Sequence, residues 1–361
     1  MKRLGIGIIG LDHWYNAIPF IAQAARDPSF ELVGVAHDDT ARAQAVLAGV
    51  GGGEAWRDPA DLLADTRIDV VATFTTIDQN ARWCVAALAA GKHVLAGKPL
   101  AMTLAEASEV VAAADASDRI LFPFECYGRV MPLYGTMKRW IDEGRIGDLL
   151  TIDCLHDAAL PMAWEDDPSP GWWTKREHAP GGGWIDHSVY QLDVIRFLSG
   201  QAIESIDGHT ARLRHADLPF EDYGAATLTL QDGVRASSKA HWLVPRGTFR
   251  RVVEVTGSAG MILYDSVLDA VRVRGDFETE VRAEANDDPR SQRRTGLPSA
   301  PELERAGTGW ATFRATPPDQ PGFLTYVGHL IEGSEEPAAD VHDGYANLEA
   351  ALSFYDRATH A

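Results

Sequence analysis

Short apolar runs alternate with amphipathic segments over the first 124 residues. The apolar runs occupy positions 4–10, 31–36, 69–74, 93–96 and 120–124. Apolar residues with helical spacing fill the intervals at about 17–26, 40–47, 80–90 and 104–117. Near-continuous apolar runs are typical of parallel strands covered on both faces. Strand following helix in this order predicts right-handed crossovers, and hence a doubly wound α/β sheet for residues 1–124.

The alternation stops after residue 124, and a different pattern follows. Strand-like runs lie at 149–155, 225–230, 235–244, 252–257 and 261–264, and several alternate apolar with polar residues. Such alternation is typical of an antiparallel or mixed sheet with one exposed face. Helical patterns cover 133–143, 184–198 and 343–359. Residues 125–361 are therefore predicted to form a second domain of the α+β class.

A polar stretch rich in Pro, Arg and Glu interrupts the second domain at about 276–322. A segment of this length without periodicity is usually a lid, an assembly arm or a disordered insert. All three interpretations remain open for this stretch.

Composition narrows the kinds of partner. A length of 361 residues exceeds what one core usually serves, which agrees with two domains. The net charge of −19 repels phosphate backbones and anionic lipids, so neither nucleic acid nor a membrane is expected as a partner. The three cysteines form no CxxC pair, which favours buried free thiols in a reducing, cytoplasmic compartment. No apolar run approaches the ~20 residues that span a bilayer, so small polar substrates remain.

The stretch GKHVLAGKPL at 91–100 carries the first candidate for chemistry. A short buried strand there is followed by Lys98, which is fixed in turn by Pro99. Because the carboxyl ends of parallel strands face the ligand crevice, an ammonium group at this point is placed to meet a substrate or cofactor. A surface lysine in a loop is the alternative.

The turn after the first strand departs from the usual dinucleotide fingerprint. A G-x-G-x-x-G match lies inside the strand and cannot form the phosphate loop, whereas the turn itself reads GLDHWY from Gly10 to Tyr15. Asp12 and Tyr15 stand where two further glycines are expected, and a Cβ at the first of these positions crowds a pyrophosphate. His13 offers a donor to a phosphate oxygen, or is a solvated turn residue.

Acidic residues follow the second strand, in the sequence His37-Asp38-Asp39. A carboxylate at that strand end suits the ribose hydroxyls of NAD and repels the 2′-phosphate of NADP. Either aspartate is also a candidate cap for the helix that begins near position 40, and this use is almost as well supported for Asp39.

Three glycines at 181–183 precede a predicted helix whose polar residues share a face. Asp186, Tyr190 and Asp193 are spaced i, i+4 and i+7. A carboxylate and a phenol are thereby held one turn apart near the helix amino end. The alternative is an N-terminal capping region followed by a half-buried tyrosine.

These motifs together resemble the glucose–fructose oxidoreductase and inositol dehydrogenase family, Gfo/Idh/MocA. The motifs that occur in the order and spacing of this family are AGKP at 96–99, GRVMP at 128–132, GRIG at 144–147 and the triple-glycine helix. The resemblance covers nearly the whole chain. It implies a dinucleotide-binding Rossmann domain at 1–124 and a substrate-binding and oligomerisation domain with a large open, mostly antiparallel sheet at 125–361. It also implies NAD or NADP in the first domain, a sugar or cyclic polyol between the two, and a homodimer or homotetramer.

The resemblance gives roles to individual residues. The lysine of the family's Glu-Lys-Pro motif is Lys98, and Gly97 stands in place of the glutamate. The family's helical aspartate is Asp186. Tyr190 occupies the position that is histidine in inositol dehydrogenases, as in the glucose–fructose oxidoreductase and dihydrodiol dehydrogenase branch, where the phenol is the acid/base. Together with the turn and strand-end residues above, the candidate cofactor-binding residues are Gly10, Asp12, His13, His37, Asp38, Thr75 and Lys98.

A mechanism follows from the charges. Hydride loss from an alcohol requires a base for the hydroxyl proton. A free tyrosine has a pKa near 10, and an ammonium within about 4–6 Å would lower it. Lys98 is expected to lower the pKa of Tyr190 and to polarise the reacting oxygen, while Asp186 orients Lys98 or holds a second hydroxyl.

Residues just before the glycine run are candidates for substrate contacts. Trp173 offers an aromatic face for a pyranose, and Lys175 offers a donor. Arg129 and His156 are further candidates, with structural roles as the alternative. No pair of histidines has the spacing of a metal site, so no metal is expected.

The sequence thus predicts a cytoplasmic NAD(P)-dependent oxidoreductase for a sugar or polyol, with NAD favoured over NADP. The alternative is a non-catalytic NAD- or sugar-binding regulator, which the altered Gly10 turn and Gly97 motivate. A third possibility is an enzyme that keeps its nucleotide bound while two sugars exchange hydride.

Overall fold

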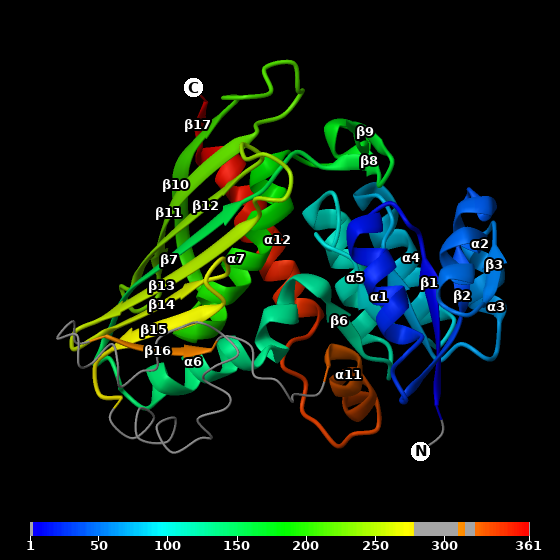
Figure 1. The fold of residues 1–361 in the computed structure, drawn as a ribbon, viewed down its shortest axis with the longest axis horizontal. Helices are drawn as coiled ribbons and strands as arrows, with labels where there is room; N and C mark the ends of the chain where they lie inside the picture. The colour runs from blue at the N-terminus through cyan, green and yellow to red at the C-terminus, as the bar shows by residue number, and fades with distance from the viewer. Residues whose placement is uncertain (1–2, 278–309, 315–321, 361) are drawn as a thin grey trace.

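The computed structural model describes residues 3–277, 310–314 and 322–360. Two large sheets dominate it, one formed by the N-terminal third of the chain and one by the rest (Figure 1). Figure 1 shows helices α7 and α12 lying between the large C-terminal sheet and the N-terminal domain. The site described below lies where the two parts meet.

The N-terminal sheet has six parallel strands in the order β3-β2-β1-β4-β5-β6. This is the predicted doubly wound arrangement. Its strands are β1 (Leu4–Ile9), β2 (Phe30–Ala36), β3 (Glu54–Trp56), β4 (Val70–Thr73), β5 (His93–Ala96) and β6 (Leu121–Pro123). Its helices are α1 (Trp14–Ala24), α2 (Thr40–Gly49), α3 (Pro59–Ala64), α4 (Ile77–Ala89) and α5 (Leu104–Asp115).

The central strands are apolar throughout because both faces of this sheet are covered. In β4, Val70 and Ala72 join an apolar cluster with residues of α1, whereas Val71 joins a second cluster with residues of α4 and α5. The α1 side is also covered by helix α11 (Phe323–Ile331), from near the end of the chain. The Phe323 ring lies 5.4 Å from that of Phe122 in β6.

The second sheet has nine strands in the order β16-β15-β14-β13-β7-β12-β11-β10-β17. Among the described strands of this second sheet, only the pairs β7–β12 and β10–β17 are parallel, which confirms a mostly antiparallel sheet. The strands are β7 (Leu149–Asp157), β10 (Ile203–Ala211), β11 (Tyr223–Leu230), β12 (Arg235–His241), β13 (Arg250–Gly257), β14 (Met261–Asp265), β15 (Ala270–Arg274), β16 (Ala311–Arg314) and β17 (Thr359–His360).

Smaller elements complete the C-terminal part. They are the 3-10 helices η1 (Phe124–Val130) and η2 (Trp172–Thr174), the hairpin of β8 (Met162–Trp164) and β9 (Asp167–Pro170), and the helices α6 (Pro132–Asp142), α7 (Gly183–Ser199) and α12 (Val341–Arg357). Most of the polar stretch at 276–322 lies outside the described residues. Its residues 311–314, however, form the edge strand β16, which the sequence pattern did not predict.

Helix α12 holds α7 in place. The Trp184 ring of α7 stacks on Phe354 of α12 with centroids 4.0 Å apart, and both side chains are fully buried. The Trp184 indole also donates a hydrogen bond of 3.2 Å to the Ala351 carbonyl. Because α12 contacts α5 as well, it ties the helix that carries Asp186 and Tyr190 to the N-terminal domain.

Cys84, Cys126 and Cys154 are free and buried, as predicted. None of the described helices has the length and apolar character needed to span a membrane.

Replacing Phe354 with alanine should lower the free energy of unfolding by about 3–5 kcal/mol, because it leaves a large cavity beneath Trp184. Urea denaturation followed by circular dichroism measures the change. Leu213→Ala, at a side chain that is 64% exposed, is the matched control and should have little effect. Equal effects of the two changes would contradict the anchoring role of α12.

Candidate active site

Lys98 is placed by a network of buried hydrogen bonds behind its turn. The Asn80 amide donates to the carbonyls of Gly97 at 2.8 Å and Leu100 at 3.0 Å. Thr73 donates to Asn80 Oδ1 at 2.6 Å and accepts from the Gly97 N–H at 2.8 Å. The ends of β4 and β5 and the start of α4 therefore fix this turn from both sides.

Gly97 is required by the close approach of this turn to β4. A Cβ at this position would lie 2.6 Å from the Thr73 carbonyl oxygen and 3.1 Å from Asn80 Oδ1. No side chain fits there without moving the backbone. The packing of this chain thus accounts for a glycine where the resembling family has glutamate.

A distant carboxylate caps the amino end of α7. Glu221 Oε1 accepts hydrogen bonds from the N–H groups of Gly182 at 2.9 Å and Trp184 at 3.1 Å. The Tyr355 hydroxyl donates to the same oxygen at 2.8 Å. A carboxylate suits this position because free N–H groups and the helix dipole both favour negative charge. The cap fixes the first turn of α7, from which Asp186 projects.

Lys98 and Asp186 form a buried ion pair between the two domains. The ammonium contacts Asp186 Oδ1 and donates at 2.8 Å to the Asp186 carbonyl. The other carboxylate oxygen accepts from the Trp242 indole at 2.9 Å. Lys98 is 4% exposed and Asp186 is 2% exposed. The structure thus brings Lys98 and Asp186 together, a contact that agrees with the first of the two roles expected for Asp186, namely to orient Lys98.

The environment of Asp186 keeps it ionised. Burial alone would raise its pKa, but His187, Lys98 and the hydrogen bonds of Lys98 and Trp242 lower it to about 2. His187 Nε2 lies 3.2 Å from Asp186 Oδ2, yet burial lowers the pKa of His187 to about 4. At neutral pH, His187 is uncharged, so Lys98 is the cation that balances Asp186.

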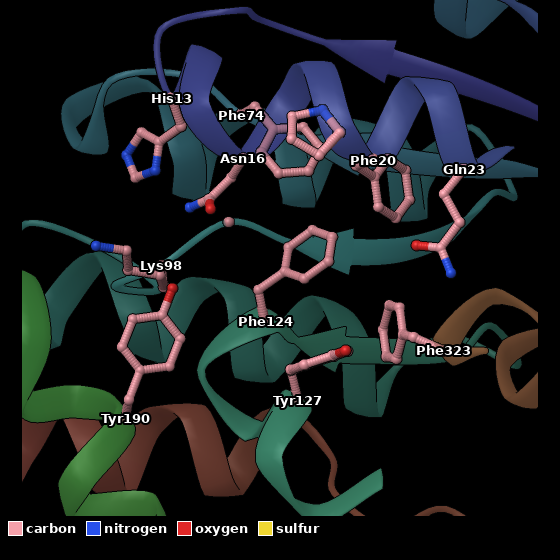
Figure 2. Close-up of a pocket in the computed structure, with 12 residues that line it drawn as sticks. His13, Asn16, Phe20, Gln23, Phe74, Lys98, Phe124, Tyr127, Tyr190 and Phe323 are labelled. Carbon is pink, nitrogen blue, oxygen red and sulfur yellow. The ribbon is translucent and has the colours of Figure 1, made fainter. Parts of the chain in front are cut away.

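Tyr190 lies beside this pair, with its ring centroid 5.4 Å from Lys98 Nζ. Figure 2 shows its hydroxyl turned toward Lys98. The expected lowering of its pKa is wrong: burial, Asp186 and Glu125 raise it, and Arg251 opposes them only in part. The main reason is burial, which disfavours the charged phenolate, and the nearby Asp186 carboxylate adds to this effect. Tyr190 is therefore a neutral phenol at physiological pH.

Two cavities meet at Lys98 and Tyr190. The first, of about 270 Å³, is lined mainly by aromatic side chains of α1, η1 and the ends of β4 and α11 (Figure 2). The second, of about 480 Å³, reaches the large sheet. Its polar lining residues are Tyr15, Asn16, Lys98, Tyr127, His156, Asp186, His187, Tyr190 and Arg251.

Sequence reasoning gave His187 and Arg251 no role in substrate binding or catalysis, although both line the second cavity. The adjacency of His187 to Asp186 is a signal that could have found the histidine. Arg251 could not have been found, because only the pairing of β13 with β7 brings it to the cavity.

The Gly10 turn is covered by η2. His13 is 3% exposed and stacks on the Trp172 ring at 4.9 Å. The Trp172 indole donates at 3.0 Å to the Asp12 carbonyl. Burial, together with Lys98, lowers the pKa of His13 to about 3. His13 is thus a neutral, buried residue rather than a solvated one, and burial also raises the pKa of the half-buried Asp12.

The residues present at this turn fit a dinucleotide. Gly10 has a φ of +86°, and a Cβ there would lie 2.8 Å from the Thr75 nitrogen. His13 Nε2 and Thr75 Oγ1 are buried and have no hydrogen-bond partner among the described residues. Buried polar atoms are normally satisfied, so these two point to a ligand that supplies the missing partners.

Asp38 and Asp39 have separate roles after β2. Asp39 caps α2 by accepting from the Arg42 N–H at 3.0 Å, which was one of the two interpretations. The Asp38 side chain is 91% exposed and lies 3.4 Å from His37 Nε2. Its carboxylate therefore stays accessible at the carboxyl end of β2, where a ribose hydroxyl is expected.

Of the expected substrate residues, His156 lines the second cavity. Trp173 is buried and lines neither cavity; its ring packs 4.6 Å from Lys98 Nζ, and its indole donates to Tyr15. Lys175 is exposed, and Arg129 is bound to Asp193 and Asp343 at 2.8 Å. The structure brings neither of these two side chains to either cavity. Within the described ranges, no three His, Cys, Asp or Glu residues gather in a way that could hold a metal ion.

Comparison with known proteins now defines the class. Residues 4–124 match the model of an oxidoreductase family with an NAD-binding Rossmann fold, and residues 134–263 match the C-terminal domain of the same family. The first domain is thus an NAD-binding Rossmann domain. The chain belongs to the Gfo/Idh/MocA family.

Its relatives include sugar and polyol dehydrogenases. Inositol 2-dehydrogenase 1 of Saccharopolyspora erythraea is 30% identical over 58% of this chain and 57% of its own length. The NAD(+)-linked scyllo-inositol 2-dehydrogenase of Bacillus subtilis is 29% identical over 72% of this chain and 71% of its own. A levoglucosan dehydrogenase solved with NADH and levoglucosan has a TM-score of 0.77 at 20% identity, covering 99% of this chain and 97% of that one. The similarity to the levoglucosan dehydrogenase structure is a similarity of fold.

Asp186→Asn should destabilise the protein by about 3 kcal/mol at pH 7, because it leaves the buried Lys98 ammonium without its counter-charge. The carboxylate has a folded pKa of about 2, below the usual 3.8. The contribution of this carboxylate to the stability of the folded protein is therefore fully present above about pH 4 and is lost as the pH falls through about 2.

Urea denaturation of both proteins between pH 7 and pH 2 checks this. The difference in the free energy of unfolding between wild type and variant should stay constant down to about pH 4 and then become smaller. Asp232→Asn, at an exposed position, is the control. A gap that widens toward low pH would contradict the ion pair.

Proposed function

We propose that the protein is an NAD-dependent oxidoreductase for a sugar or polyol, in which Tyr190 exchanges a proton with the reacting oxygen and Lys98 polarises that oxygen. The observation that carries this proposal is the position of these two side chains, which line both cavities at once. A cofactor ring on one side and a carbinol on the other would meet at them.

The aromatic cavity suits the cofactor. Gly10, His13, Thr75 and Lys98 would hold its nicotinamide and phosphate portion, and Asp38 its ribose hydroxyls. When bound, the cofactor supplies or accepts the hydride. The aromatic walls exclude water from the reacting carbon, which strengthens the electrostatic effect of Lys98.

The second cavity suits the substrate. Its volume of about 480 Å³ falls within the range of small-molecule sites. The names of the relatives point to cyclic sugars and polyols. Hydroxyl groups would find hydrogen-bond partners in His156, His187 and Asn16 around the wall.

The state of Tyr190 favours one direction. As a neutral phenol with a raised pKa, it is a proton donor for a carbonyl oxygen at neutral pH. At neutral pH the side chain is therefore in the protonation state that reduction of a carbonyl requires. Lys98, which is held by Asp186, stabilises negative charge as it develops on that oxygen.

The test combines binding with kinetics. Isothermal titration with NADH should give saturable binding, and panels of sugars, inositols and their keto forms should show turnover with NADH or NAD. Tyr190→Phe should lower kcat by roughly 10²–10⁴-fold, the usual contribution of a general acid, while NADH binding stays unchanged. Tyr345→Phe, on α12 away from both cavities, is the control.

Other results would reject the proposal in distinct ways. If neither NADH nor NADPH binds, the chain is no dehydrogenase. If NADH binds and no substrate turns over, the chain is instead a binding or regulatory member of its family. Full activity in Tyr190→Phe would remove the tyrosine from the mechanism.

Asp38→Ser should shift the cofactor preference toward NADPH. The change removes a negative charge that repels a 2′-phosphate, and Arg57, whose Nε lies 3.4 Å from the Asp38 carbonyl, then remains nearby. The ratio of NADPH to NADH affinity should rise by about tenfold, equivalent to ~1.4 kcal/mol. Titration of both nucleotides measures it, and Asp58→Ser, at the cap of α3, serves as control. An unchanged ratio of NADPH to NADH affinity would show that the ribose does not bind at Asp38.

A further inference from the structure

Arg251 projects from the large sheet into the second cavity. It lies on β13 directly opposite His156 on β7. Residues opposite each other in an antiparallel pair point to the same face of a sheet. Both side chains line the cavity that contains Lys98 and Tyr190. Arg251 is thus part of the wall that faces the proposed reacting centre.

The guanidinium of Arg251 has no counter-charge within the described ranges. Its Nε is buried without a hydrogen-bond partner, and its nearest recorded ring contact is Phe249, at 5.8 Å. The neighbouring Arg250 differs, because it pairs with Asp265 at 2.7 Å. Arginine side chains normally donate several hydrogen bonds through their planar guanidinium group. The guanidinium group of Arg251 donates none to the described residues.

No other charge in the cavity compensates for Arg251. Lys98 and Asp186 balance each other, and burial lowers the pKa of both His156 and His187, so that neither is charged at neutral pH. Glu125 lines a smaller cavity together with Arg251, but burial raises its pKa to about 8 and leaves it protonated. The cavity therefore carries one surplus positive charge.

A surplus charge in a partly buried site is costly unless a ligand neutralises it. One positive charge matches a carboxylate, which has one negative charge and the geometry for a bidentate guanidinium contact. A phosphate group, which carries nearly two negative charges at pH 7, would leave a surplus of the opposite sign. The charge count favours the carboxylate.

We infer that the substrate is a sugar acid, whose carboxylate is bound by Arg251 while a carbinol of the same molecule faces Lys98 and Tyr190. This inference rests on the proposed function only in placing the carbinol at Lys98 and Tyr190. His156 Nδ1, which is also buried without a partner among the described residues, is placed next to Arg251 to bond a hydroxyl of the same sugar. The arginine is a binding residue for substrate and has no part in the proton transfer.

Calorimetric titration tests the inference without any turnover. Matched pairs are glucose and glucuronate, galactose and galacturonate, and mannose and mannuronate, each titrated with and without saturating NADH, which cannot accept a hydride. At least one acid should bind about tenfold or more tightly than its neutral partner. Arg251→Gln should bring that ratio close to one, Arg251→Lys should retain part of it, and Arg250→Gln should leave it unchanged. Circular dichroism establishes that each variant is folded.

Two results overturn the inference. One is that no acid of the panel binds more tightly than its neutral sugar, and the other is that the ratio survives in Arg251→Gln. Glucose 6-phosphate is included as a third ligand, and tighter binding of it than of any uronate would overturn the assignment to a carboxylate. Failure of the proposed function gives a different pattern, in which the acid still binds through Arg251 but no substrate turns over.

Discussion

The buried contact between Lys98 and Asp186 is the constraint on which the rest of the site depends. One partner comes from the turn after β5 and the other from the first turn of α7, so the pair fixes how the two domains face each other. Each charge is tolerated out of water only because the other is present, since removing one partner of such a pair leaves an uncompensated buried ion. The Thr73 and Asn80 network on one side and the Glu221 cap on the other hold the two backbones that bring the charges together.

This pairing also decides the chemistry of its neighbours. A free ammonium beside a phenol would stabilise the phenolate, whereas an ammonium already paired with a carboxylate does so only weakly. Burial is the main cause of the raised pKa of Tyr190, and the ion pair does not offset it, so the side chain remains protonated and suits the role of acid. The same neutralisation leaves Arg251 as the charge that a ligand in the second cavity would encounter. In the proposed mechanism, the ion pair thus separates the reacting end of the cavity, at Tyr190, from the end at Arg251 that binds the substrate.

The sequence could predict most of the N-terminal domain, apart from the short elements β3 and α3, because apolar runs are unambiguous when a strand is covered on both faces. It also located Lys98 and Asp186, whose positions follow from strand and helix ends. It missed β10, whose sequence IESIDGHTA does not keep a regular alternation, and β16, which lies within a polar stretch. It could not foresee that η2 covers the Gly10 turn, or that Asp186 would cancel the effect of Lys98 on Tyr190, because both depend on contacts between residues far apart in the chain.

The indole rings around the Gly10 turn have an optical consequence. Trp172 and Trp173 stack with centroids 4.4 Å apart, and Trp172 also stacks on His13. Light emitted by tryptophan overlaps the absorption of reduced nicotinamide, so rings this close to the dinucleotide turn would pass their excitation to it. With a dinucleotide bound at this turn as proposed, tryptophan fluorescence would report the oxidation state of the coenzyme without any attached dye.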